Sequence, residues 1–121
     1  MPVKYEDLPP QIQNQLQQLQ QFQQQMEITI QQRQQIEIRI KDIENALEEL
    51  EKLEKDASVF KNVGPILIKA GASDVKKELQ ESKESLEVRK GTMEKQEKRL
   101  KEKIDEIQTK IQGSLSQPQA G

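Results

Sequence analysis

The chain has 121 residues with a formal net charge of −2, and only 32% of them are apolar and three aromatic, too few for one compact core. We therefore expect an extended shape. The absence of Cys and His excludes disulfides, thiol nucleophiles, imidazole catalysis and zinc sites built on these residues. Because both charge signs are mixed along the chain, no basic face for a nucleic acid is expected.

The sequence also lacks the features of membrane and secreted proteins. No apolar run approaches the roughly 20 residues of a membrane span, and the first six residues lack the apolar centre of a secretory signal. A soluble, cytoplasmic protein is expected. The high charge content is compatible with disorder, but the helical spacing of Ile and Leu favours an ordered chain.

A long first helix is predicted from about residue 10 to 55, because proline is tolerated in the first helical turn and Pro9-Pro10 stands at its start. Steps of four and three residues, typical of a coiled coil, connect its predicted packing seam. Two steps of three meet at Ile30, Arg33 and Ile36, which predicts a local change of supercoil winding. Ile28 and Ile38 lie off the seam and are expected to contact a neighbouring subunit. The predicted seam is Ile12, Leu16, Leu19, Gln23, Met26, Ile30, Arg33, Ile36, Ile40, Ile43, Leu47 and Leu50.

A β-hairpin is predicted from about residue 58 to 70, where Gly64-Pro65 separates two strand-length apolar runs. A lone hairpin is marginally stable in water, and its edges invite other strands, so we expect it to pair with hairpins of other chains. The alternative is a simple cap on an antiparallel coiled coil. The residues expected to drive subunit assembly are Val59, Phe60, Val63, Gly64, Ile66, Leu67 and Ile68.

A second helix is predicted from about residue 74 to 112, with Ser73 or Asp74 as its N-cap. Two steps of four meet at Leu100. Gly113 and Pro118 bracket its end, leaving a polar tail, 114–121, that is expected to be flexible. The predicted seam is Val75, Leu79, Ser82, Leu86, Arg89, Met93, Gln96, Leu100, Ile104, Ile107 and Ile111. Residues 1–121 are thus expected to form one domain of mainly α class, a long antiparallel two-helix coiled coil joined by one β-hairpin.

The end of the helix pair farthest from the hairpin is the candidate binding surface for other proteins. Residues 11–35 contain fourteen glutamines and two charged residues, and such a flank approaches apolar surface with little electrostatic penalty. A merely solvated Gln-rich face is the alternative. Fraying at a free coiled-coil end exposes apolar side chains, although ordinary seam packing is the simpler interpretation for Leu19 and Ile107. The candidate residues are Leu8, Ile12, Leu16, Leu19, Ile107, Ile111 and Leu115.

No catalytic, cofactor-binding or metal-binding residue is predicted. Gly64-Pro65 and Gly71 lack the spacing and the Lys-Ser/Thr ending of a phosphate-binding loop. The many carboxylates lie along an open coiled coil, without the enclosed site that acid–base catalysis needs. The pattern therefore indicates an assembly subunit and not an enzyme.

Several segments together resemble β-type subunits of the prefoldin family, over essentially the whole chain. One hairpin, not two, indicates the β type over the α type. Phe60 stands where a tyrosine is expected, which keeps the ring and removes a hydroxyl. The matching segments are Leu8-Pro-Pro-Gln-Ile-Gln with the Gln-rich helix, Ala46-Leu-Glu-Glu-Leu50, Val59-Phe-Lys-Asn-Val-Gly-Pro-Ile-Leu-Ile68, Leu86-Glu-Val-Arg89 and Glu94-Lys-Gln-Glu97.

The resemblance implies a heterohexamer of two α and four β subunits, whose hairpins join into intersubunit β-barrels. It also implies an ATP-independent chaperone, without a cofactor, that captures unfolded proteins at the coiled-coil tips and passes them to a group II chaperonin. The alternative is a structural coiled-coil tether, in which the hairpin oligomerises and the helices hold specific partners. Suppression of aggregation of several unrelated denatured proteins would separate the two functions.

Overall fold

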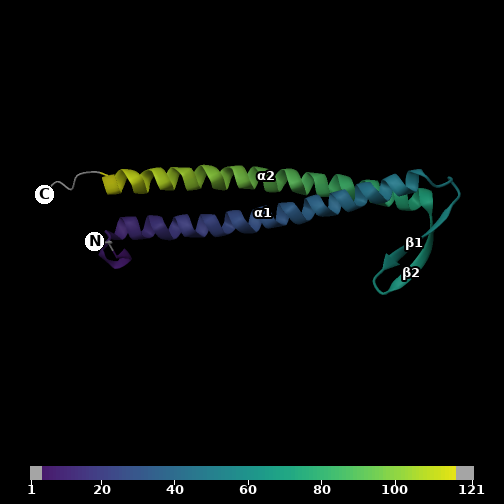
Figure 1. The fold of residues 1–121 in the computed structure, drawn as a ribbon, viewed down its shortest axis with the longest axis horizontal. Coiled ribbons are helices and arrows are strands. Elements are labelled where there is room, and N and C mark those ends of the chain that lie inside the picture. The colour runs from purple at the N-terminus through teal and green to yellow at the C-terminus, as the bar shows by residue number, and fades with distance from the viewer. Residues whose placement is uncertain (1–3, 117–121) are drawn as a thin grey trace. The chain divides into compact units, whose positions relative to one another are not determined.

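The computed structural model describes residues 4–116, which form two long helices and one antiparallel hairpin (Figure 1). The elements in chain order are η1 (Tyr5–Asp7), α1 (Pro10–Glu51), β1 (Ser58–Val63), β2 (Ile66–Gly71) and α2 (Ala72–Ser116). The predicted fold class, mainly α with two long helices joined by one β-hairpin, is confirmed.

The described residues divide into two compact units. In the unit of residues 33–92, Lys76 pairs with Glu51 and Lys83 lies 3.7 Å from Glu44, so α1 and α2 run antiparallel there. In the other unit, residues 4–32 and 93–116, the start of α1 lies beside the end of α2. The Lys103 ammonium is 5.4 Å from the centroid of the Phe22 ring, a cation–π distance.

The packing seam of α1 is more regular than predicted. Thr29 is only 2% exposed, whereas Ile30 beside it is half-buried, and Phe22 is half-buried where Gln23 is exposed. With Thr29 and Phe22 in the seam, steps of three and four alternate without a break, so the predicted irregularity at Ile30 was wrong. The seam is Ile12, Gln15, Leu19, Phe22, Met26, Thr29, Arg33, Ile36, Ile40, Ile43, Leu47 and Leu50.

Thr29 can occupy a seam position because its hydroxyl needs no partner on the other helix. The hydroxyl donates to the backbone carbonyl of Gln25 at 2.8 Å, one turn earlier in the same helix. This local bond is a common arrangement for threonine inside helices. Burial of Thr29 therefore leaves no unpaired polar atom.

The seam of α2 is regular as well, but long charged side chains fill part of it. Ser82, Arg89 and Gln96, predicted in the seam, are exposed. The next residues along the chain, Lys83, Lys90 and Glu97, occupy these seam positions instead. A lysine or glutamate can pack its methylene groups in a seam and place its charge at the edge. The predicted break at Leu100 was therefore wrong. The seam is Ala72, Lys76, Leu79, Lys83, Leu86, Lys90, Met93, Glu97, Leu100, Ile104, Ile107 and Ile111.

The end of α1 and the start of α2, on either side of the hairpin, differ from the prediction. α1 ends at Glu51, and the N–H groups of Lys52 and Leu53 then bond to carbonyls three residues back, a tight final turn. α2 begins at Ala72, directly after β2. The Ser73 hydroxyl does not cap α2; it donates to the Lys55 carbonyl at 3.3 Å, tying α2 to the segment after α1.

α2 continues through Gly113 to Ser116. The predicted flexible tail therefore begins too early, since residues 114–116 are helical and 117–121 lie outside the described residues. A glycine inside a helix costs only about 1 kcal/mol relative to alanine. Burial of Ile111, two residues before Gly113, anchors this last stretch of the helix.

Candidate functional site: the hairpin and the tip

The hairpin is a complete two-stranded ladder that closes in a two-residue turn. β1 and β2 pair from Ser58 opposite Gly71 to Val63 opposite Ile66. Gly64 has a φ of +61°, a left-handed conformation that glycine adopts without strain. The predicted turn at Gly64-Pro65 thus sets the register of the two strands.

Apolar side chains lie on both faces of this hairpin. Side chains alternate along a strand and cross-strand partners share a face, so Phe60 and Leu67 share one face, and Val63, Ile66 and Ile68 share the other. Phe60 is 67% exposed, Leu67 64% and Ile66 60%. The chain by itself leaves both faces largely uncovered.

An ion pair joins the middle of the hairpin to α2. Lys61, on the same face as Ile66, lies 3.1 and 3.2 Å from the two carboxylate oxygens of Glu78. Among the predicted assembly residues, only Val59, near the start of β1, is half-buried, and the other six are exposed. The hairpin is therefore positioned by α2 while its apolar surface stays open.

The structure separates the seven predicted client-binding residues into three groups. Ile12, Ile107 and Ile111 are buried as seam residues. Leu8, Leu16 and Leu19 are half-buried, and Leu115 is 60% exposed. We call the region formed by residues 5–23 and 104–116 the tip.

A hook at the start of the chain shapes the tip. η1 lies against α1 because the Gln13 side-chain amide donates to the carbonyls of Tyr5 and Leu8, at 3.1 and 2.9 Å. The Tyr5 hydroxyl in turn donates to the Gln13 carbonyl at 3.1 Å. The sequence reasoning missed both residues. The position of a lone aromatic ahead of the helix was the available signal for Tyr5.

This hook completes a pocket of about 530 Å³. The pocket brings together Leu16 and Leu19, two of the predicted residues, with the Tyr5 ring and glutamine side chains. Its walls carry no formal charge, so it can contact apolar groups and hydrogen-bond to amides whatever the charge of the bound chain. The lining residues are Tyr5, Leu16, Gln17, Leu19, Gln20 and Gln23.

Among residues 4–116, no helix has an apolar stretch long enough to cross a lipid bilayer. Within the same residues, no three His, Cys, Asp or Glu side chains gather closely enough to hold a metal ion.

The sequence profile described as "Prefoldin subunit" matches residues 13–117. The chain belongs to the prefoldin family. It is 50% identical over 115 residues to prefoldin subunit beta of Archaeoglobus fulgidus, covering 95% of this chain and 98% of that one. It is 41% identical over 116 residues to prefoldin subunit beta of Pyrococcus furiosus, covering 96% and 99%.

A solved structure shares the fold. The crystal structure of the prefoldin beta subunit from Thermococcus strain KS-1 matches with a TM-score of 0.83 at 41% identity, over 91% of this chain and 96% of that one. The resemblance drawn from the sequence is confirmed. Prefoldin-family proteins are chaperone components, and this chain is accordingly a chaperone subunit.

Proposed function

We propose that this chain is a β-type subunit of an ATP-independent holdase of the cytoplasm, which captures unfolded proteins at its coiled-coil tips and passes them to a group II chaperonin. Its similarity to prefoldin beta subunits over nearly its full length supports this function. The observation that carries the proposal is the presence of uncovered apolar surface in two separate places, the hairpin and the tip.

In this proposal the hairpin joins the subunits. Phe60 and Leu67 on one face and Ile66 on the other each gain about 1.5 to 3 kcal/mol when fully buried against partner strands. The unpaired edges of β1 and β2 offer backbone groups for further strands. Two α-type and four β-type subunits would bring such hairpins together in intersubunit β-barrels.

The tip holds the client in this proposal. Leu8, Leu16, Leu19 and Leu115 offer accessible apolar surface beside uncharged glutamines. The buried residues Ile12, Ile107 and Ile111 would add contacts only where the last helical turns part, and helix ends open more readily than helix centres. Several weak contacts on several subunits together give useful avidity.

Truncation of the tip tests this assignment. Deleting residues 1–16 together with 111–121 should abolish suppression of aggregation while leaving hexamer mass and most helicity unchanged. A truncated complex that assembles normally and protects clients as well as the full-length protein would overturn the tip assignment.

A milder variant separates loss of the binding surface from loss of structure. Leu16→Gln with Leu19→Gln keeps the helix and removes the apolar wall of the tip pocket. Leu53→Gln is the matched control, because Leu53 is an exposed leucine near the other end of α1. Only the double variant should let several unrelated denatured proteins aggregate. If the double variant protects unrelated clients as well as the wild type does, the tip pocket is not the client site. If the wild-type complex itself does not protect them, the function is a specific tether instead.

A further inference from the structure

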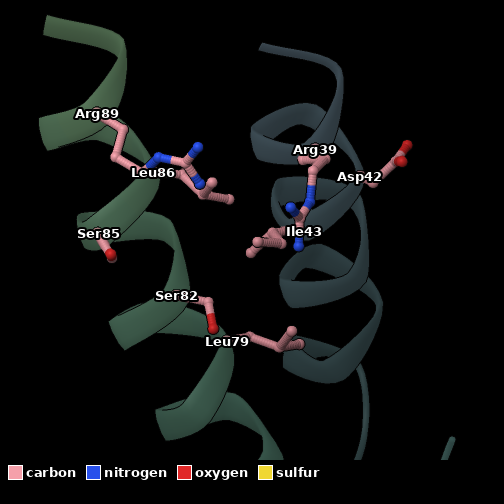
Figure 2. A pocket seen from close by; sticks show the side chains of 8 residues that line it. All are labelled: Arg39, Asp42, Ile43, Leu79, Ser82, Ser85, Leu86 and Arg89. Atoms are coloured by element: carbon pink, nitrogen blue, oxygen red, sulfur yellow. The ribbon is translucent and has the colours of Figure 1, made fainter. Parts of the chain in front are cut away.

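A second surface lies in the unit of residues 33–92, where a groove of about 500 Å³ runs between α1 and α2 (Figure 2). Its floor is apolar, because Leu86 is only 6% exposed and Ile43 and Leu79 are half-buried. The groove is wide because the side chains of Ser82 and Ser85 are short. Its lining residues are Arg39, Asp42, Ile43, Leu79, Ser82, Ser85, Leu86 and Arg89.

One arginine from each helix lines this groove. The Arg89 side chain of α2 extends toward α1 and the Arg39 side chain of α1 runs along its own helix toward Ile43, whereas the Asp42 carboxylate points away from α2 (Figure 2). Within residues 4–116, neither arginine side chain makes a hydrogen bond or an ion pair. The groove therefore presents two cations whose donors are unused.

The other flank of the same helix pair is charge-matched. There Lys83 lies 3.7 Å from Glu44, and Lys76 pairs with Glu51. Glu44 follows Arg39 by five residues, which places it about 140° further around the helix. One flank thus joins opposite charges across the helices, whereas the groove flank carries one arginine from each helix.

We propose that this groove binds an acidic segment of a partner protein. Carboxylates of the segment meet Arg39 and Arg89, and an apolar side chain between them packs on Ile43 and Leu86. The charge complementarity is specific, since guanidinium groups bind carboxylates through two parallel hydrogen bonds. The apolar floor selects a peptide over a free anion, which would leave that surface in water. Neither the hairpin nor the tip takes part.

The test measures binding of a fluorescent peptide, in which two glutamates flank a leucine, to the assembled complex. Arg39→Gln with Arg89→Gln should weaken binding about tenfold or more, because charged hydrogen bonds are lost. The control Lys41→Gln with Lys77→Gln removes the same charge at exposed positions outside the groove, and should leave the affinity unchanged.

A further variant keeps both arginines. Ser82→Phe should fill the groove and weaken peptide binding to a similar extent, while circular dichroism shows unchanged helicity. The proposal is overturned if the peptide does not bind the wild-type complex or if the double arginine variant binds it equally well. It also fails if a peptide with glutamines in place of the glutamates binds as tightly. If the complexes associate with one another and the same arginine substitutions abolish this association, the groove binds a second copy instead.

Discussion

Tyr5 and Gln13 hold each other in place through their backbone carbonyls. The Tyr5 hydroxyl donates to the Gln13 carbonyl at 3.1 Å, and the Gln13 side-chain amide donates to the Tyr5 carbonyl, also at 3.1 Å. The two bonds span eight residues and hold η1 beside α1. Because Tyr5 also lines the tip pocket with Leu16, this pair determines whether that pocket has an outer wall.

Gln13→Ala should therefore release the hook without unfolding the helices. The substitution removes the bonds that the Gln13 side-chain amide donates to the carbonyls of Tyr5 and Leu8, each worth about 0.5 to 1.5 kcal/mol locally, and keeps the bond from the Tyr5 hydroxyl to the backbone. We expect faster amide hydrogen exchange over residues 5–8, weaker aggregation suppression and almost unchanged Tm. Gln18→Ala, at an exposed position of the same helix, is the control. Equal exchange rates in the two variants would contradict this role of Gln13.

Ile66→Lys with Ile68→Lys should release subunits from the assembled complex while the helices remain folded. Both side chains lie on one face of the hairpin, and two ammonium groups there would have to be buried against partner strands at high cost. Native mass spectrometry measures the loss of the proposed hexamer. Val88→Lys changes an apolar residue of α2 that is also exposed, and this variant should assemble normally. An intact hexamer in the double variant would exclude the hairpin as the assembly element.

Client binding should resist salt. The pocket at the tip is lined by tyrosine, leucine and glutamine, which gain little from Coulomb attraction. Charged contacts weaken as the screening length falls from about 10 Å at 0.1 M to about 3 Å at 1 M. Aggregation suppression measured across this range should stay nearly constant. Loss of most of the client affinity would point to the Glu- and Lys-rich surface of α2.

Thr29→Val should stabilise the protein by up to about 1 kcal/mol, since a buried hydroxyl becomes a methyl group. No polar group loses its only partner, because the Gln25 carbonyl still accepts the backbone N–H of residue 29 within the helix. Chemical denaturation measures the change. Thr109→Val is the matched control. Thr109 makes the same bond one turn back at an exposed position, so the stability of the Thr109→Val protein should shift by less than about 0.5 kcal/mol.

Replacing either of two glycines with alanine should change the stability of the protein, in opposite directions at the two positions. Gly64→Ala forces a side chain into a left-handed conformation at a cost of about 1 to 2 kcal/mol, although the space around it is open. Gly91→Ala should stabilise α2 by about 1 kcal/mol, because nothing lies near the added methyl group. The denaturation midpoints of the two assembled variants measure the direction of each change in stability. A stabilised Gly64→Ala protein would contradict the strain argument.

The sequence was sufficient for the fold because its signals were local. Gly64-Pro65 between β-branched runs predicted the hairpin and its turn, and long periodic segments predicted both helices. The seam was harder to place, because it mixes apolar and polar residues. The prediction took the apolar Ile30 although Thr29 is buried, and it took Ser82 although the longer side chain of Lys83 fills that seam position. Only unbroken three-and-four spacing would have identified Thr29 and Lys83.

The candidate sites could be predicted only in part. The exposed hairpin residues follow from strand composition, and Leu16 and Leu19 follow from their place near the chain end. The hook depends on individual hydrogen bonds between Tyr5 and Gln13, which leave no periodic trace in the sequence. The groove depends on which flanks of two helices meet, so Arg39 and Arg89 could not be paired before the seam was known.

The apolar hairpin also has a consequence for the unassembled subunit. A newly made chain carries Phe60, Ile66 and Leu67 in water, next to strand edges that pair readily with other chains. Free subunits are therefore prone to aggregate, as are the misfolded proteins that a chaperone binds. Their solubility depends on rapid assembly with partner subunits. Matched synthesis of the different subunits is then a condition for the supply of this chaperone, because any excess of one chain would itself be prone to aggregate.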